Sequence, residues 1–244
     1  MADTALLEIG LSDQRLHALS SKRIFFGHQS VGDNIIQRLR DSLAADSRLG
    51  FRIVNSRNPE TVSGPAFIDA YIGENANPQS KNSDFLAIVN RGFDGIAMFK
   101  YCYVDIGEAT SVRQMFHDYE ATIDAVRRQN PLVRIVHVTV PLTTVIPSPK
   151  AWLKSLLGRN TAQRDNIKRN LYNTLLREAY PKEPIFDLAT LESTHANGSR
   201  SFFKYGGEHI YTLTSEYTDD GGHLNQTGSR LAAKLLIEVL ANVR

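Results

Sequence analysis

Residues 23–45 read Arg-Ile-Phe-Phe-Gly-His-Gln-Ser-Val-Gly-Asp-Asn-Ile-Ile-Gln-Arg-Leu-Arg-Asp-Ser-Leu-Ala-Ala. The compact apolar run at the start of this stretch predicts a buried strand over Arg23–Gly27. Apolar residues then recur at positions 31, 35, 39 and 43, one stripe of an amphipathic helix, which predicts a helix over Ser30–Ala45. A buried strand that runs directly into an amphipathic helix is the repeating unit of α/β proteins.

The same alternation continues along the chain. Further strands are predicted at Phe51–Asn55, Gly95–Tyr103, Leu132–Val140 and Pro184–Leu188. Helices are predicted at Leu11–Ser20, Asp84–Asn90, Ser111–Gln129 (with Ser111 and Gln114 as a capping box), Thr161–Ala179 and Gln226–Val243. The stretch between residues 56 and 80 is rich in Gly, Pro and Asn and predicts loops around a short helix. Because parallel neighbours need crossover connections, the pattern predicts a doubly wound, three-layer α/β/α sandwich with a five-stranded parallel sheet.

Length and charge narrow the classes of protein. The 244 residues predict one domain, 1–244, in which residues 1–20 form an N-terminal extension with a short helix. Twenty-eight Lys and Arg against 26 Asp and Glu leave a net charge of +2, with no run of basic residues. A nucleic-acid partner is therefore not expected.

Membrane and export signals are not visible in the sequence. No stretch reaches the ~18 consecutive apolar residues of a membrane-spanning helix, so no membrane insertion is expected. The first residues lack a basic region, and Glu8 stands where a signal peptide has its apolar centre. The single Cys102 fits a reducing compartment without requiring one, so cytoplasmic, periplasmic and secreted locations all stay open.

Ser30 is the first candidate for chemistry. It stands at the junction between a predicted strand and a helix, where ligands of doubly wound sheets bind. There its hydroxyl lies near the open edge of the sheet, and its N–H, at a helix N-terminus, can donate to a developing oxyanion. A serine at this junction also serves commonly as a helix N-cap.

Asp220 and His223 are the second candidate. They stand three residues apart in Asp219-Asp220-Gly221-Gly222-His223-Leu224-Asn225, just before the last predicted helix. The two glycines allow the carboxylate to turn back to the imidazole, fix its tautomer and support it as a base toward Ser30. A surface turn with an exposed histidine is the alternative interpretation.

Together the two stretches resemble the SGNH or GDSL hydrolase family. The first, Ile24-Phe-Phe-Gly-His-Gln-Ser30, carries the serine after the first strand, and Asp220-Gly-Gly-His223-Leu-Asn225 matches the family's Asp-Gly-x-His-Pro-Asn block except for Leu at the Pro position. The resemblance implies a flavodoxin-like sandwich, ester hydrolysis through a Ser30-His223-Asp220 triad, and no cofactor.

The chain departs from this family at the oxyanion hole. Two residues separate Gly27 from Ser30, and no Asn follows the predicted third strand. The Ser30 N–H, the Gly73 N–H and the Asn75 amide are the expected oxyanion donors, with Gly64 as the rival glycine.

Other polar residues near predicted strand ends are candidate pocket residues: His28, Gln29, Lys100 and Tyr101. A lysine next to a strand end more often extends its ammonium group to solvent or pairs with a carboxylate, here Asp94 or Asp105. Asp187 is the main competitor to Asp220 as the triad acid, although a structural acceptor for loop N–H groups is the more typical role of an aspartate in that position. His137, His195 and His209 lack ligand spacing, so no metal is expected.

The predicted function is a serine esterase acting on small or carbohydrate acyl esters, acetyl esters above all. A polysaccharide O-acetyltransferase would use the same triad with a different acceptor. A non-catalytic carbohydrate-binding or scaffold domain on the same fold is the alternative from another class.

Overall fold

A computed structural model describes residues 11–45, 50, 52–89, 92–145 and 161–243. Its elements follow one another in the order α1 (Asp13–Ser20), β1 (Arg23–His28), α2 (Ser30–Ala45), β2 (Ile53–Asn55), η1 (Pro59–Thr61), β3 (Ala66–Tyr71), α3 (Pro78–Val89), β4 (Ile96–Phe99), η2 (Tyr103–Asp105), α4 (Val112–Gln129), β5 (Arg134–Ile135), β6 (His137–Val138), α6 (Thr161–Ala179), β7 (Ile185–Phe186), α7 (Leu188–Ser193), β8 (Phe202–Tyr205), β9 (Glu208–Tyr211), η3 (Ser215–Tyr217) and α8 (Gln226–Asn242).

The centre of the fold is a five-stranded parallel sheet in the order β2-β3-β1-β4-β5. Only Val136 separates β5 from β6, and its N–H donates to the carbonyl of Ala97 in β4. On the other side β6 pairs with β7 in parallel, so the β6–β7 pair continues the same layer. The predicted three-layer sandwich with a five-stranded parallel sheet is confirmed.

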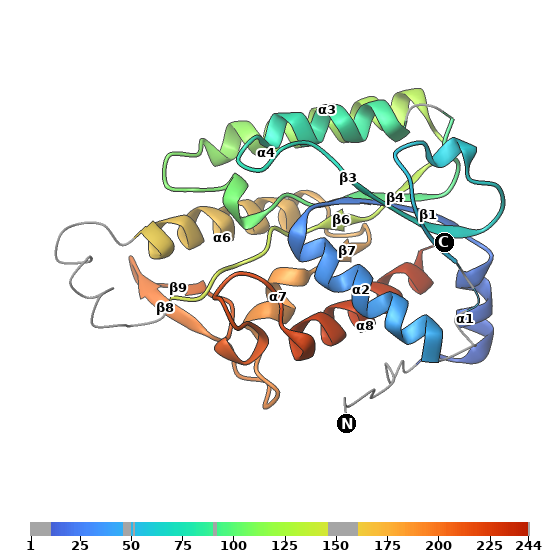
Figure 1. Cartoon of the computed structure of the whole chain (residues 1–244). Coiled ribbons are helices and arrows are strands. Elements are labelled where there is room, and N and C mark those ends of the chain that lie inside the picture. The colour runs from blue at the N-terminus through green and yellow to red at the C-terminus, as the bar shows by residue number, and fades with distance from the viewer. Residues whose placement is uncertain (1–10, 46–49, 51, 90–91, 146–160, 244) are drawn as a thin grey trace.

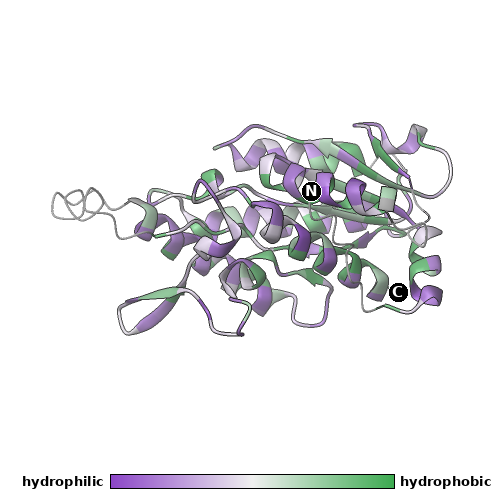
Figure 2. Ribbon diagram, turned by 60° about the horizontal axis from the view of Figure 1, so that its bottom comes forward, coloured by the Kyte–Doolittle hydropathy of each residue, from purple (hydrophilic) through white to green (hydrophobic). Residues whose placement is uncertain are grey.

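Helices cover both faces of the sheet (Figure 1). On one face α1, α2, α7 and α8 pack against β1, β3 and β4 around side chains such as Ile35, Phe26 and Leu236. On the other, α3, α4 and α6 pack around Phe25, Phe99 and Tyr172. Hydrophobic residues follow the central strands and the helix sides turned toward them, as Figure 2 shows.

One strand of the sheet was not predicted. The segment read as loops contains β3, which lies between β1 and β2, in register with all six residues of β1. Pro65 and Gly64 just before it and Asp69 within it obscure the strand pattern, because Asp69 is a buried carboxylate among apolar neighbours. Asp69 is accommodated there by Arg40 and Asn55, each donating at 2.9 Å.

Several smaller predictions were wrong. The helix predicted from Asp84 begins at Pro78, and β8, β9 and α7 were not predicted. Ser111 caps α4 without a side-chain hydrogen bond, and the Gln114 amide donates to Asp118 instead of forming a capping box.

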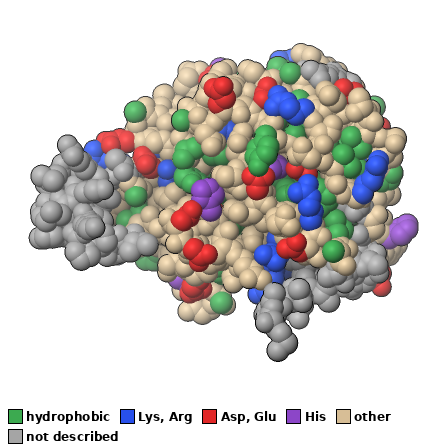
Figure 3. Space-filling model, viewed as in Figure 1, with side chains coloured by type: hydrophobic (Ala, Val, Ile, Leu, Met, Phe, Trp, Pro, Cys, Tyr) green, Lys and Arg blue, Asp and Glu red, His purple; other side chains and the backbone are tan. Residues whose placement is uncertain are grey.

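Surface charge is mixed on the face shown in Figure 3. There the Lys and Arg side chains are interspersed with Asp and Glu, and neither sign gathers into a single patch. Within the described ranges, no helix combines the length and apolar character needed to cross a bilayer.

Candidate active site

Ser30 and His223 meet at the carboxyl edge of the sheet. Ser30 is the first residue of α2, two residues beyond the end of β1, and His223 lies in the loop between η3 and α8. The Ser30 Oγ is 3.0 Å from His223 Nε2, although 193 positions separate the two residues. The loop is docked onto α2 by the Leu224 N–H, which donates to Asn34 Oδ1 at 3.3 Å. Because α8 packs beside α2, Ser30 at the start of α2 and His223 just before α8 lie next to each other.

Asp220 holds the other nitrogen of the same imidazole. Its Oδ2 is 2.6 Å from His223 Nδ1. Its Oδ1 accepts from the N–H groups of Gly222 at 2.9 Å and His223 at 2.8 Å. These donors, the Gly222 N–H first and then the His223 ring and N–H, hold the pKa of Asp220 well below its ordinary range. An ionised carboxylate accepts only, so Nδ1 carries the imidazole proton and Nε2 is left as the acceptor for the Ser30 hydroxyl.

Glycine at position 221 makes this turn possible. Gly221 has φ +91°, a left-handed conformation that disfavours a side chain, and its N–H donates to Thr218 Oγ1 at 2.9 Å. The tight turn brings the carboxylate of Asp220 within hydrogen-bond distance of the ring of His223. Ser, His and Asp groups connected in this order form a relay in which the imidazole can accept the serine proton.

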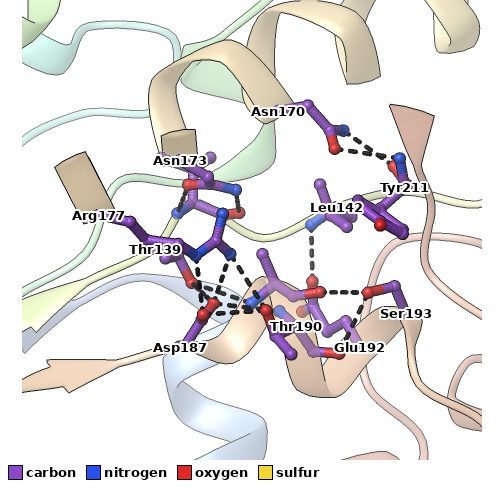
Figure 4. A network of polar contacts seen from close by, with 12 residues as sticks. Thr139, Leu142, Asn170, Asn173, Arg177, Asp187, Thr190, Glu192, Ser193 and Tyr211 are labelled. Atoms are coloured by element: carbon purple, nitrogen blue, oxygen red, sulfur yellow. Dashed lines mark hydrogen bonds and ion pairs between the residues drawn. The ribbon is translucent and has the colours of Figure 1, made fainter. Parts of the chain in front are cut away.

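Asp187, the competing acid, lies elsewhere. It caps α7 by accepting from the Thr190 N–H at 3.1 Å, and Arg177 donates to it at 2.6 and 2.8 Å (Figure 4). The Arg177 side chain and Thr190 offset its burial and keep the pKa of Asp187 below its usual value. Asp187 is thus an internal structural acceptor.

The residues proposed to line the pocket are largely structural. Lys100 is fully buried, with its Nζ 3.7 Å from Cys102 Sγ, and the buried Tyr101 hydroxyl donates to Asn82. His28 is buried as well, and its Nε2 lies 3.5 Å from Asp69 Oδ2. These three side chains, expected to line the pocket, are buried in the interior, and none of them lines the pocket beside Tyr103.

Lys100 also has neither of the carboxylate partners considered for it. Asp94 pairs with Arg23, and Asp105 forms a fully buried ion pair with Lys81 at 2.7 Å.

Gln29 joins the first strand to the third. Its side-chain amide donates to the carbonyls of Ile72 at 3.0 Å and Gly73 at 2.9 Å. The residue therefore braces the loop after β3 against the start of α2, with its amide protons already used.

The glycines proposed for the oxyanion hole do not serve as expected. Gly64 precedes β3, whose first residue pairs with Arg23 at the amino end of β1, so it lies at the opposite edge of the sheet from Ser30. The Gly73 N–H donates to Asp84 Oδ2 at 2.6 Å and is already used. Asn75 is exposed in the turn closed by the Glu74–Asn77 bridge, and within the described residues no hydrogen bond links it to Ser30 or His223.

Tyr103 was missed by the sequence reasoning. It is the first residue of η2, and its hydroxyl lies 3.5 Å from His223 Nε2. A pocket of about 530 Å³ opens beside it, lined among others by Thr143, Asp165, Arg169 and Gly222. The only signal for Tyr103 was its place at the end of the predicted strand Gly95–Tyr103, a position shared with Lys100 and Tyr101, which are buried.

No protein-family model matches the sequence, and no curated protein matches it. Solved structures do share its fold. A GDSL-like lipase from Bacteroides thetaiotaomicron VPI-5482 superposes with TM-score 0.55 at 12% identity, covering 93% of this chain and 94% of its own. A carbohydrate esterase family 3 structure from Talaromyces cellulolyticus gives TM-score 0.50 at 14% identity, covering 91% and 98%.

The chain shares its α/β/α fold with these two structures. At these identities the likeness concerns the fold alone. The chemistry of the site depends on the side chains that surround Ser30 and His223. Among the residues that the structure describes, no group of three or more His, Cys, Asp or Glu side chains is placed to hold a metal ion.

Proposed function

We propose that the protein is a serine esterase of the SGNH type that hydrolyses acyl esters, acetyl esters above all. The observation that carries the proposal is the connected relay, 3.0 Å from Ser30 Oγ to His223 Nε2 and 2.6 Å from Nδ1 to Asp220 Oδ2. These separations are within the range in which a base activates a nucleophile and an acid orients the base.

The reaction follows from the order of the groups. Ser30 Oγ attacks the acyl carbon while His223 Nε2 takes its proton, and Asp220 stabilises the imidazolium that forms. The imidazolium returns the proton to the departing alcohol, leaving an acyl-enzyme. Water then attacks the acyl carbon while His223 Nε2 takes its proton. This step releases the carboxylic acid and restores Ser30.

The Ser30 N–H supports the oxyanion in this proposal. It lies in the first turn of α2, where helix N–H groups have no intrahelical acceptor and carry the positive end of the helix dipole. The Asn75 amide, exposed in the loop after β3, is the candidate second donor. Each such donor contributes roughly 3 kcal/mol to the transition state.

The residues that line the pocket favour a small polar ester as substrate rather than an ester of a long lipid. Its lining combines polar residues, Thr143, Tyr103, Asp165 and Arg169, with the apolar Val104 and Ile106. Such a lining matches the hydroxyl groups of an acetylated sugar, whereas a lipid chain requires an apolar wall.

The test is turnover of p-nitrophenyl acetate by the protein and by Ser30→Ala. Loss of the hydroxyl removes the nucleophile, so we expect the variant to lose nearly all activity, on the order of 10⁴-fold or more. Mass spectrometry of a rapidly quenched reaction should show an acetyl group on Ser30. Equal turnover by both proteins, or no turnover of any acetyl ester by the unmodified protein, would refute the proposal.

A further inference from the structure

The hydroxyl of Tyr103 reaches the same nitrogen as the hydroxyl of Ser30. Its oxygen lies 3.5 Å from His223 Nε2, and the two rings meet edge to face with centroids 5.7 Å apart. Since Nε2 has one lone pair, only one hydroxyl can donate to it at a time. When Ser30 occupies that lone pair, the Tyr103 hydroxyl is left beside the reacting centre with its proton available.

Two close neighbours, Arg169 and Gly222, restrict the Tyr103 ring. Arg169 Nε donates to the Tyr103 carbonyl at 2.9 Å, and its guanidinium lies 5.8 Å from the ring centroid. The backbone of Gly222 also approaches the ring, so closely that a Cβ there would be 2.9 Å from Tyr103 Cζ. The hydroxyl is therefore held in place before any substrate binds.

The short helix that carries Tyr103 is anchored as well. The Asp105 carboxylate accepts from the Cys102 N–H at 2.6 Å and from the fully buried Lys81 ammonium at 2.7 Å. A buried ion pair at the base of η2 keeps its first residue from moving away from the site.

The pocket bears on which part of the ester lies next to Tyr103. Tyr103, Asp220 and Gly222 line the pocket together, and both Tyr103 and Asp220 contact the His223 ring, so the pocket adjoins the imidazole. In the proposed reaction Nε2 must return its proton to the alcohol oxygen, which therefore faces the imidazole. The pocket next to Tyr103 is the one that the alcohol part of the substrate would enter.

We propose that Tyr103 is a further catalytic residue, whose hydroxyl donates a hydrogen bond to the alcohol oxygen as it departs into this pocket. The inference rests on the proposed esterase function. The bond from Ser30 Oγ to the acyl carbon forms as the serine proton moves to Nε2. The bond from the acyl carbon to the alcohol oxygen then breaks, and that oxygen receives the proton from Nε2, while Tyr103 keeps its own proton throughout.

The ionisation of Tyr103 agrees with a donor role. Burial, and after it the negative charge of Asp220, raises the pKa of Tyr103 above its ordinary value. The phenol therefore stays protonated over the whole range in which a serine esterase works.

The experiment compares kcat/KM for ethyl acetate and p-nitrophenyl acetate in the protein and in Tyr103→Phe. Both esters give the same acetyl-enzyme, and kcat/KM reports only the steps through acylation. Ethanol needs help to leave, whereas p-nitrophenolate leaves as a stable anion. Because a hydrogen bond to a charged group contributes about 1.5–3 kcal/mol, Tyr103→Phe should lose on the order of 10- to 100-fold on ethyl acetate and less than about 3-fold on p-nitrophenyl acetate. Equal losses on the two esters, or no loss on either, would overturn the assignment.

Controls separate this inference from the function on which it rests. If Ser30→Ala hydrolyses both esters as fast as the unmodified protein, the esterase mechanism fails and the role of Tyr103 fails with it. If Ser30→Ala is inactive but Tyr103→Phe keeps full activity on ethyl acetate, only the role of Tyr103 is refuted. Tyr205→Phe removes the same hydroxyl group from an exposed position on the β8–β9 hairpin. It should leave kcat/KM unchanged for both esters.

Discussion

The backbone of Gly222 lies directly against the ring of Tyr103, where a Cβ atom would stand 2.9 Å from Cζ and 3.1 Å from the hydroxyl oxygen. Contacts below 3.0 Å do not persist, so an added methyl group must displace its neighbour, and the outer end of a tyrosine ring moves more readily than backbone.

Gly222→Ala should therefore move the Tyr103 hydroxyl away from His223 without removing it. We expect a selective loss of kcat/KM on ethyl acetate relative to p-nitrophenyl acetate, in the same direction as in Tyr103→Phe, with an unfolding midpoint close to that of the unmodified protein. Steady-state kinetics and thermal melts measure the two effects. A variant with unchanged ester selectivity would show that this contact does not set the position of the hydroxyl.

Asp220→Asn tests the orientation of the base. The asparagine keeps an oxygen for the N–H groups of Gly222 and His223, so the turn should persist, but its amide no longer attracts the proton on Nδ1. We expect kcat to fall by ~10³- to 10⁴-fold, as for the wrong imidazole tautomer in a serine-histidine-aspartate triad. The neighbouring Asp219→Asn removes the same charge and should retain most activity. Comparable losses in the two variants would mean that charge alone is responsible.

The buried pair of Lys81 and Asp105 should matter for stability. Lys81→Met leaves the Asp105 carboxylate in the interior without its cation, which costs roughly 3–5 kcal/mol of unfolding free energy. Urea denaturation measures the loss. Lys204→Met, at an exposed position on the β8–β9 hairpin, should change stability by less than about 0.5 kcal/mol. A similar small change at Lys81 would show that the pair adds nothing over an apolar side chain.

Glu192 should make stability depend on pH. It is fully buried, and its Oε2 accepts from the Leu142 N–H at 2.6 Å (Figure 4). Burial raises the pKa of Glu192 to about 8 from its ordinary 4.5, so between these values the folded protein holds a proton that the unfolded chain releases. The native state binds more protons in this window, and the contribution of Glu192 to the unfolding free energy therefore falls as pH rises from about 4.5 to about 8.

Glu192→Gln removes this titration. Its unfolding free energy relative to that of the unmodified protein should rise steadily across the same window in urea denaturation at successive pH values. The exposed Glu60→Gln should run parallel to the unmodified protein. Parallel curves for Glu192→Gln as well would show that the carboxyl group is already ionised at the lower end of the window.

Local signals predicted most of the helices. The four-residue apolar spacing in α2 and the long polar-apolar pattern in α6 gave their bounds, Ser30–Ala45 and Thr161–Ala179, as the structure has them. The strand β3 escaped because its buried Asp69 is compensated by Arg40 and Asn55, partners that only the tertiary structure supplies. The β8–β9 hairpin did carry a signal, Gly206-Gly207 with φ values of +57° and +87°, which favours a tight turn between strands.

The candidate site was predictable where its chemistry is local. Asp220 and His223 stand in one turn, and Ser30 stands shortly after the first strand, so their spacing, together with the resemblance of the two stretches to the SGNH hydrolases, indicated both. The side chains of Lys100 and Tyr101 could not be oriented from the sequence, because proximity to a strand end does not distinguish the rim of the sheet from the interior. The Gly73 N–H was assigned to the oxyanion because its partner Asp84 lies 11 residues away, on α3.

The helix that starts with Ser30 packs against the helix that follows His223 (Figure 1). During synthesis the serine leaves the ribosome early, whereas its proton acceptor is translated 193 residues later. A nascent chain can thus assemble β1 to β4 and still be chemically inert. In the proposed mechanism, hydrolysis of a fluorogenic acetate would begin only once α8 has docked against α2, so turnover would report that docking step.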